Sequence, residues 1–234
     1  AGFVDAIAGG GGLITVPALM LAGVPPAQAL ATNKVQGVFG AATAAISYAR
    51  LGLVDPRKQL PEAAIAFLAG LCGAALVSWL PTQALRYGLP VVLIGIALFF
   101  ALRPGLDDND RIRRITPGAF AVIVVPAIAF YDGLVGPGTG AFFMLSFVML
   151  AGYGILKATA HTKLLNFGSN LGGLTAFALV GQPLWLLGAA MALAQVAGAM
   201  LGARLAMRSG ARVIKPLLVL TSTGLALRLI WQLL

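Results

Sequence analysis

The chain has 234 residues, of which 59% are hydrophobic and only 10% are charged. Soluble domains are about 45–50% apolar and about 25% charged, and disordered chains are more polar still, so this composition excludes both classes. The excess of 16 Lys and Arg residues over 7 Asp and Glu residues would suggest a nucleic-acid partner in a soluble protein, but in a membrane protein it is typical of basic cytoplasmic loops. We therefore expect an all-α integral membrane protein that contacts the lipid bilayer and no nucleic acid.

Apolar segments long enough to cross a bilayer follow one another along the chain. A spanning helix needs about 20 mostly apolar residues, and such segments lie at about 27–49, 62–80, 87–102, 159–180, 184–203 and 213–233. Two more apolar segments, at 1–22 and about 117–151, are interrupted by glycines. Glycine costs about 1 kcal/mol in a helix interior and proline about 3 kcal/mol, so each interruption predicts a broken helix or a re-entrant hairpin. Because the chain opens with Ala1 inside an apolar segment, we expect part of a first helix to precede it.

The two interrupted segments match each other, which predicts an internal repeat. Asp5 corresponds to Asp132, and Lys34 corresponds to Lys163. Glycines align between them, with Gly9 matching Gly136 and Gly11 matching Gly138. We therefore divide the chain into a first half at 1–102, a charged cytoplasmic linker at 103–116, and a second half at 117–234, all within one compact bundle.

The basic residues predict how the halves are oriented. They gather in three clusters, at 50–58, 103–114 and 204–215, and positively charged loops stay in the cytoplasm. The loops near 81–86 and 181–183 and both ends of the chain are then outside. This assignment makes the halves antiparallel, and inverted repeats with broken helices are a recurring transporter architecture with the site near the bilayer midplane.

One stretch resembles the first motif of the TauE/SafE (TSUP) family of sulfite exporter-like membrane transporters: AGFVDAIAGGGGLITVPALMLAGVPPAQALATNK. Another resembles the second motif of that family: FYDGLVGPGTGAFFMLSFVMLAGYGILKATAHTKLLNFGSNLGG. The likeness covers essentially the whole chain and is closest to the YfcA-like branch. It implies a secondary transporter or exporter of a small anion, such as sulfite or a sulfonate, in the bacterial inner membrane, with no catalytic residue and no bound cofactor.

The glycine-rich breaks are the first candidates for substrate contact. The N-terminus of a helix presents free N–H groups and about half a positive charge, which favours an anion, and glycine lets the anion approach the backbone closely. The alternative is that these glycines serve only tight packing, as Gly168-x-x-x-Gly172 and Gly198-x-x-x-Gly202 do in our interpretation. The candidates within 9–12 and 136–140 are Gly10, Gly11, Gly12, Gly138, Thr139 and Gly140.

Two lysines lie within apolar helices, Lys34 and Lys163. A cation inside the bilayer is expensive and is a functional candidate by default, so both are candidate ligands of an oxyanion. The alternative is a structural ion pair with Asp5, with Asp132 or across the halves, which would cancel the charge. For the two aspartates we weigh helix capping, pairing with lysine and transport of a coupling proton.

Other polar residues in the apolar segments complete the candidate set. His161, the only histidine, is a candidate proton carrier because imidazole titrates near neutral pH, although a lone polar residue is more often a satisfied hydrogen-bonding group. Asn33, Asn166 and Asn170 must point into the bundle, since buried amides need partners. They either complete an oxyanion shell or join helices to one another.

The composition and the repeat favour a secondary transporter that works by alternating access between the two halves. An anion channel of the same architecture is the alternative. A membrane-embedded enzyme lacks support, because the chain has no HExxH or GxSxG motif, one histidine and one cysteine, and we expect no metal site. An assembly subunit has no reason to keep paired charges at membrane depth. The candidate partners are the small anionic substrate, a coupling proton or sodium ion, and a second copy of the chain in a homodimer.

Overall fold

The computed structural model describes residues 1–77, 79–80, 83, 108–110, 112–180, 183–214, 216–217 and 220. Every regular element within these ranges is a helix, so the predicted all-α class is confirmed. Three helices there, Pro56–Val77, Pro117–Leu134 and Trp185–Ser209, are long and apolar enough to cross a membrane. The predicted span at 87–102 and most of the one at 213–233 lie outside the described residues.

The first half opens with a broken helix. α1 (Gly2–Ala8) ends where Gly9 takes the left-handed conformation, with φ of 73°, and α2 (Gly11–Leu21) starts two residues later. Proline at the first helical position suits a helix start, because its missing N–H group would have no partner there. Pro26 and Pro56 open the two long helices that follow, α3 (Pro26–Arg50) and α4 (Pro56–Val77).

The second half has the same order of elements. Thr116 caps the short helix α6 (Pro117–Ala119) by accepting a hydrogen bond from the Ala119 N–H at 3.2 Å. A π-helical turn, η1 (Phe120–Val124), leads into α7 (Val125–Leu134) just before Pro126, which has no N–H to donate. After the second glycine break come three further helices: α8 (Thr139–Met149), α9 (Ile155–Val180) and α10 (Trp185–Ser209).

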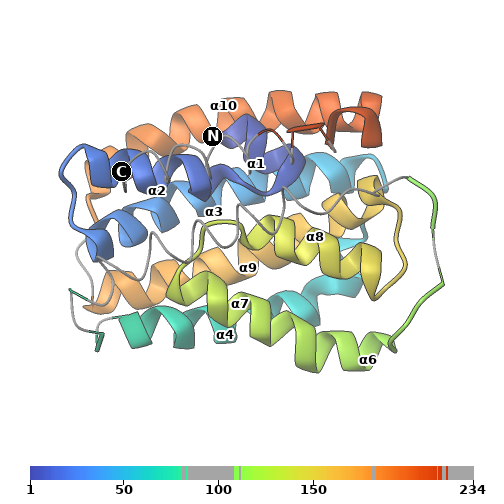
Figure 1. Ribbon diagram of the computed structural model, residues 1–234, viewed down its shortest axis with the longest axis horizontal. Coiled ribbons are helices and arrows are strands. Elements are labelled where there is room, and N and C mark those ends of the chain that lie inside the picture. The colour runs from blue at the N-terminus through green and yellow to red at the C-terminus, as the bar shows by residue number, and fades with distance from the viewer. Residues whose placement is uncertain are drawn as a thin grey trace.

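The long helices α3 and α9 pack against each other in the middle of the bundle (Figure 1). α10 packs on α3 and α4 packs on α9, while α1 lies against α10 and α7 against α4. Each of these contacts joins the two halves, and each has a counterpart in which the halves are exchanged. Figure 1 shows α2 toward one end of the bundle and α8 toward the opposite end. The predicted inversion of the repeat would produce this arrangement, and it stays a prediction.

Small residues permit the closest crossings. A Cβ atom added at Gly168 would lie 2.4 Å from the Ala63 carbonyl oxygen of α4, and one at Gly202 would lie 2.4 Å from the Phe3 carbonyl oxygen of α1. Such contacts leave no room for a side chain. These two glycines therefore pack helices together, as predicted for both GxxxG patterns.

The charged linker joins the ends of several helices. The Asp110 side chain accepts a hydrogen bond from the Gly154 N–H at 2.7 Å, and the Asp108 side chain accepts one from the Ala211 N–H at 2.8 Å. The linker, the turn before α9 and the residues after α10 thus meet at one end of the bundle. This places the described residues of the second and third basic clusters on one side, and their cytoplasmic location stays a prediction.

Candidate functional site

The two glycine breaks contact each other inside the bundle. A Cβ atom on Gly9 would lie 2.3 Å from the carbonyl carbon of Gly140, and the φ angle of Gly9 is +73°. Gly136 and Gly138 in the second break also take positive φ angles, 90° and 86°. Both predicted breaks are confirmed, although α2 already begins at Gly11 and α8 at Thr139. Some of the candidate glycines therefore lie in the breaks, and others lie in the first turns of α2 and α8.

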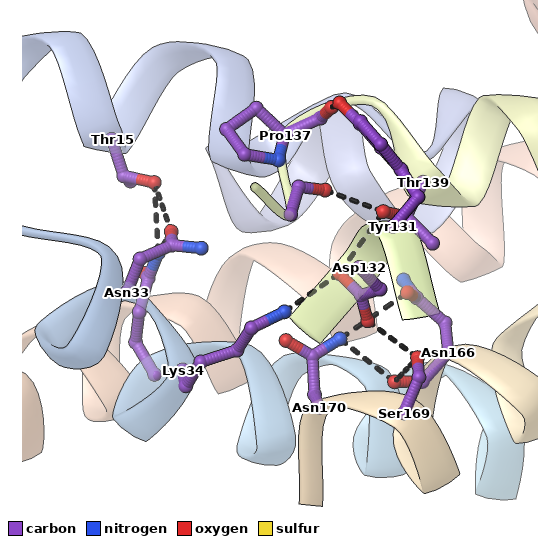
Figure 2. A network of polar contacts seen from close by, with 12 residues as sticks. Thr15, Asn33, Lys34, Tyr131, Asp132, Pro137, Thr139, Asn166, Ser169 and Asn170 are labelled. Carbon is purple, nitrogen blue, oxygen red and sulfur yellow. Dashed lines mark hydrogen bonds and ion pairs between the residues drawn. The ribbon is translucent and has the colours of Figure 1, made fainter. Parts of the chain in front are cut away.

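Lys34 and Asp132 form a buried ion pair between the halves. The Lys34 Nζ atom lies 2.7 Å from the Asp132 Oδ1 atom, and both side chains are only 2% exposed. Asp132 also accepts hydrogen bonds from the Thr139 hydroxyl at 3.0 Å and from the Ser169 hydroxyl. Figure 2 shows these three donors converging on one carboxylate. Asp132 thus holds together α3, α8 and α9.

Lys163 makes the reciprocal contact in a different way. Its Nζ atom donates to the main-chain carbonyl oxygen of Asp5. The carboxylate of Asp5 instead accepts a hydrogen bond from the Gly11 N–H at 3.2 Å and caps α2. Of the alternatives weighed from the sequence, pairing of Lys34 with Asp5 and of Lys163 with Asp132 is therefore wrong. Each lysine contacts the broken segment of the other half.

Buried amides surround the junction of the breaks. The Asn33 side-chain oxygen accepts hydrogen bonds from the Thr15 hydroxyl at 2.5 Å and from the Gln36 amide at 2.8 Å. In the second half, the Asn170 amide nitrogen donates to the Asn166 side-chain oxygen at 3.2 Å. In this arrangement the side-chain oxygens of Asn33 and Asn166 accept these bonds and their NH₂ groups point the other way. Within the described part of the chain, the NH₂ groups of Asn33 and Asn166 have no hydrogen-bond acceptor.

In Figure 2 the Asn33 nitrogen is turned away from Thr15, toward the side on which Asp132 lies. It faces a polar cavity of about 20 Å³, which is room for about one water molecule. Residues of both halves line this central cavity: Asp5, Gly9, Gly12, Asn33, Gln36, Gly37, Asp132, Gly136, Gly138, Thr139, Gly140, Asn166, Asn170 and Gln195.

The structure places some of the candidate residues at the central cavity and others away from it. The aspartates, the three asparagines, Thr139 and several of the glycines line the central cavity, but Gly10, Gly11 and the two lysines do not. Gln36, Gln195 and Ser169 were not predicted, although each is a polar residue in an apolar helix, the signal that identified the asparagines. His161 lies elsewhere, with its ring 4.9 Å from that of Tyr153. Among the described residues, no group of three or more His, Cys, Asp and Glu side chains could hold a metal ion.

Comparison with known proteins agrees with the motifs. The family described as Sulfite exporter TauE/SafE matches residues 1–229. The Sinorhizobium protein named Probable membrane transporter protein ORF9 is 54% identical over 230 residues, which cover 98% of this chain and 88% of the relative. The Escherichia coli K12 protein named Probable membrane transporter protein YfcA is 44% identical over 232 residues, covering 99% of this chain and 86% of the relative. No solved structure matches the chain.

The centre of the apolar bundle is polar and is built from two broken helices, one in each half, as a membrane transporter requires. A family match over nearly the whole chain assigns the protein to such transporters. The predicted resemblance is confirmed, and the protein is a transporter and not an enzyme. The chain belongs to the TauE/SafE family and is a multi-pass transporter of the bacterial inner membrane.

Proposed function

We propose that the chain is a secondary transporter of a small oxyanion, sulfite or a related sulfonate, and that the substrate binds in the central cavity. The observation that carries this proposal is the pair of amide NH₂ groups, on Asn33 and Asn166, that line the cavity without an acceptor in the described part of the chain. One comes from each half. An oxyanion would supply the missing acceptors, and hydrogen bonds to a charged partner are the strong ones.

The backbone supports the same class of substrate. α2 and α8 both begin at the cavity, so the positive ends of their dipoles point at it. The Gly11 N–H group is already used by Asp5, which leaves Gly12 and Gly140 as the glycines of the first turns that line the cavity. Neither has a side chain to keep an anion away from the main chain.

The aspartates have different roles in this proposal. Asp132 is neutralised by Lys34 and saturated by two hydroxyl groups, so it is structural. Asp5 lines the cavity, and the N–H group of Gly11 is the one donor to its carboxylate among the described residues. A carboxylate there would repel an anion unless it carried a proton. We therefore assign the coupling proton to Asp5 rather than to Asp132 or His161.

The size of the cavity requires movement. Room for about one water molecule does not admit sulfite, which has several heavy atoms. The cavity must widen before the substrate enters, and the contact of Gly9 with Gly140 lies between the broken segments of the two halves. Alternating access by movement of one half against the other would open that contact.

Anion binding to the purified chain tests the proposal. Sulfite, methanesulfonate, thiosulfate and acetate are titrated by calorimetry, and uptake of the bound anion is then measured in liposomes. Asn33→Leu and Asn166→Leu should each weaken binding about tenfold or more, because a hydrogen bond to a charged ligand is lost. Thr43→Val, on an exposed part of α3, is the matched control and should leave the affinity unchanged. Full-strength binding by both folded asparagine variants would overturn the assignment.

A further inference from the structure

A second cavity, separate from the central one, opens at the end of the bundle where the linker lies. Its volume is about 350 Å³, within the range of about 300–1,000 Å³ typical of small-molecule sites, and it shares no lining residue with the central cavity. It is lined by the loop at 52–55 and the start of α4, by the end of the linker and the start of α6, and by residues of η1, α8 and α9.

Two residues that line this second cavity each carry a buried oxygen atom that has no hydrogen-bond donor within the described part of the chain. These atoms are Gln59 Oε1 and Glu62 Oε2, one turn apart on α4. Gln59 is 6% exposed, and its amide nitrogen donates to the His161 carbonyl oxygen at 3.1 Å. That bond fixes the orientation of the amide, so its oxygen is the free side. A buried acceptor without a donor is costly, and a charged one more so.

Aromatic rings form another wall of the second cavity. The rings of Phe120 and Phe147 stack at 4.5 Å, and the ring of Phe147 lies 5.6 Å from that of Tyr153. All three line the cavity together with Gln59 and Glu62. Ring faces attract cations, and the Lys157 Nζ atom already lies 4.3 Å from the centroid of the Tyr153 ring. The rings also provide an apolar surface for a short carbon chain. A bare ion would leave most of a cavity of this size empty.

Two of the basic residues that line the second cavity, Lys58 and Arg113, lie at its mouth, and the third, His161, belongs to the aromatic wall beside Tyr153. The Lys58 side chain is 87% exposed, and its Nζ atom lies 3.7 Å from Asp55 Oδ2. Arg113 is also exposed. Charges in solvent are screened, whereas the unpaired oxygens are buried. The interior of the second cavity therefore presents unpaired oxygen acceptors, which suit a cationic ligand that carries N–H donors.

We propose that the second cavity binds a primary ammonium group carried on a small apolar body, with the ammonium donating to Glu62 and Gln59 and the body packed on Phe120, Phe147 and Tyr153. Two sources supply this chemistry: a soluble amine, or the headgroup of phosphatidylethanolamine in the surrounding membrane. The proposal does not depend on which anion the central cavity transports.

Binding of butylammonium chloride to the purified chain, measured by calorimetry at fixed ionic strength, tests this site. We expect saturable binding that Glu62→Gln weakens about tenfold or more. Thr43→Val, on α3 outside the lining of this cavity, is the control and should change the affinity less than about twofold. Tetramethylammonium, which has no N–H group, should bind at least about tenfold more weakly than butylammonium.

The same titration in nanodiscs separates the two sources. Weaker binding in phosphatidylethanolamine discs than in phosphatidylcholine discs would assign the site to the lipid headgroup, and equal binding would assign it to a soluble amine. The proposal is overturned if folded wild-type protein binds no butylammonium, if Glu62→Gln binds it with wild-type affinity, or if tetramethylammonium binds equally well.

Discussion

The ammonium group of Lys34 and the carboxylate of Asp132 lie 2.7 Å apart, although the residues belong to different halves of the chain. Lys163 reaches in the opposite direction, to the main chain of Asp5. The lysines that the repeat relates therefore have unequal partners, a carboxylate for Lys34 and a peptide carbonyl for Lys163. This inequality leads to different expectations for the two lysines.

Lys34→Gln is expected to destabilise the fold. Removing one partner of a buried ion pair leaves the other charge uncompensated, at a cost of about 3–5 kcal/mol, and both side chains here are 2% exposed. Asp132→Asn alone should be similarly harmful. The double variant should regain part of the lost stability, as measured by thermal unfolding in detergent. Losses that simply add in the double variant would mean that the two charges do not interact.

Lys163→Gln is expected to act more on binding than on folding. Its described polar contact is a neutral carbonyl oxygen, so its charge is not cancelled by a direct ion pair in the described part of the chain. If the ammonium attracts the anion into the cavity without touching it, binding should weaken by less than the ~1.5–3 kcal/mol of a direct charged hydrogen bond, because Lys163 does not line the cavity. Calorimetry with the bound anion and thermal unfolding of the same sample provide the comparison. Unchanged affinity in a stable Lys163→Gln protein would leave the amides and helix ends as the anion site.

Gly9→Ala tests the contact between the breaks. Gly9 and Gly23 both have positive φ angles, 73° and 86°, but an added Cβ atom meets Gly140 only at Gly9, since nothing lies within 4 Å at Gly23. Gly23→Ala should cost about 1–2 kcal/mol through backbone conformation. Gly9→Ala should lower the free energy of unfolding by about 1–3 kcal/mol more, because of overpacking. Equal losses in the two variants would contradict the contact with Gly140.

The linker should lose its attachment in acid. Hydrogen bonding from the Gly154 N–H, followed by the Lys157 side chain, lowers the pKa of the Asp110 carboxyl from its ordinary value of 3.8. Because the pKa of this carboxyl is lower in the folded state, the carboxylate stabilises the fold at pH values above its ordinary pKa. That contribution is lost as the pH falls through the lowered pKa of the folded state. Proteolysis of the linker should therefore accelerate at acid pH, below about 4. Asp110→Asn should already be cleaved faster at neutral pH.

The linker should face the cytoplasm. In a Cys72→Ser background, Asn109→Cys should react with a membrane-impermeant maleimide only when the cytoplasmic face is exposed. Ala22→Cys, in the turn after α2 at the other end of the bundle (Figure 1), should react from the periplasmic face. The reverse pattern would invert the assigned orientation.

Local chemistry in the sequence determined the elements. Runs of apolar residues predicted α3, α4, α9 and α10, because a bilayer requires such runs wherever a helix crosses it. Glycine and proline predicted the two breaks for an equally local reason, their cost within a helix. The family followed from the long motifs at those breaks.

The tertiary structure alone decided which residues meet. Whether Lys34 pairs with Asp5 or with Asp132 depends on how two halves pack, and residue spacing within one half carries no information about that. The positions of Gln36 and Gln195 at the central cavity, the bond of Ser169 to Asp132 and the separation of His161 from the cavity have the same origin. Local backbone energetics specifies the helices and their breaks, whereas the site is a set of long-range contacts that only packing of the halves creates.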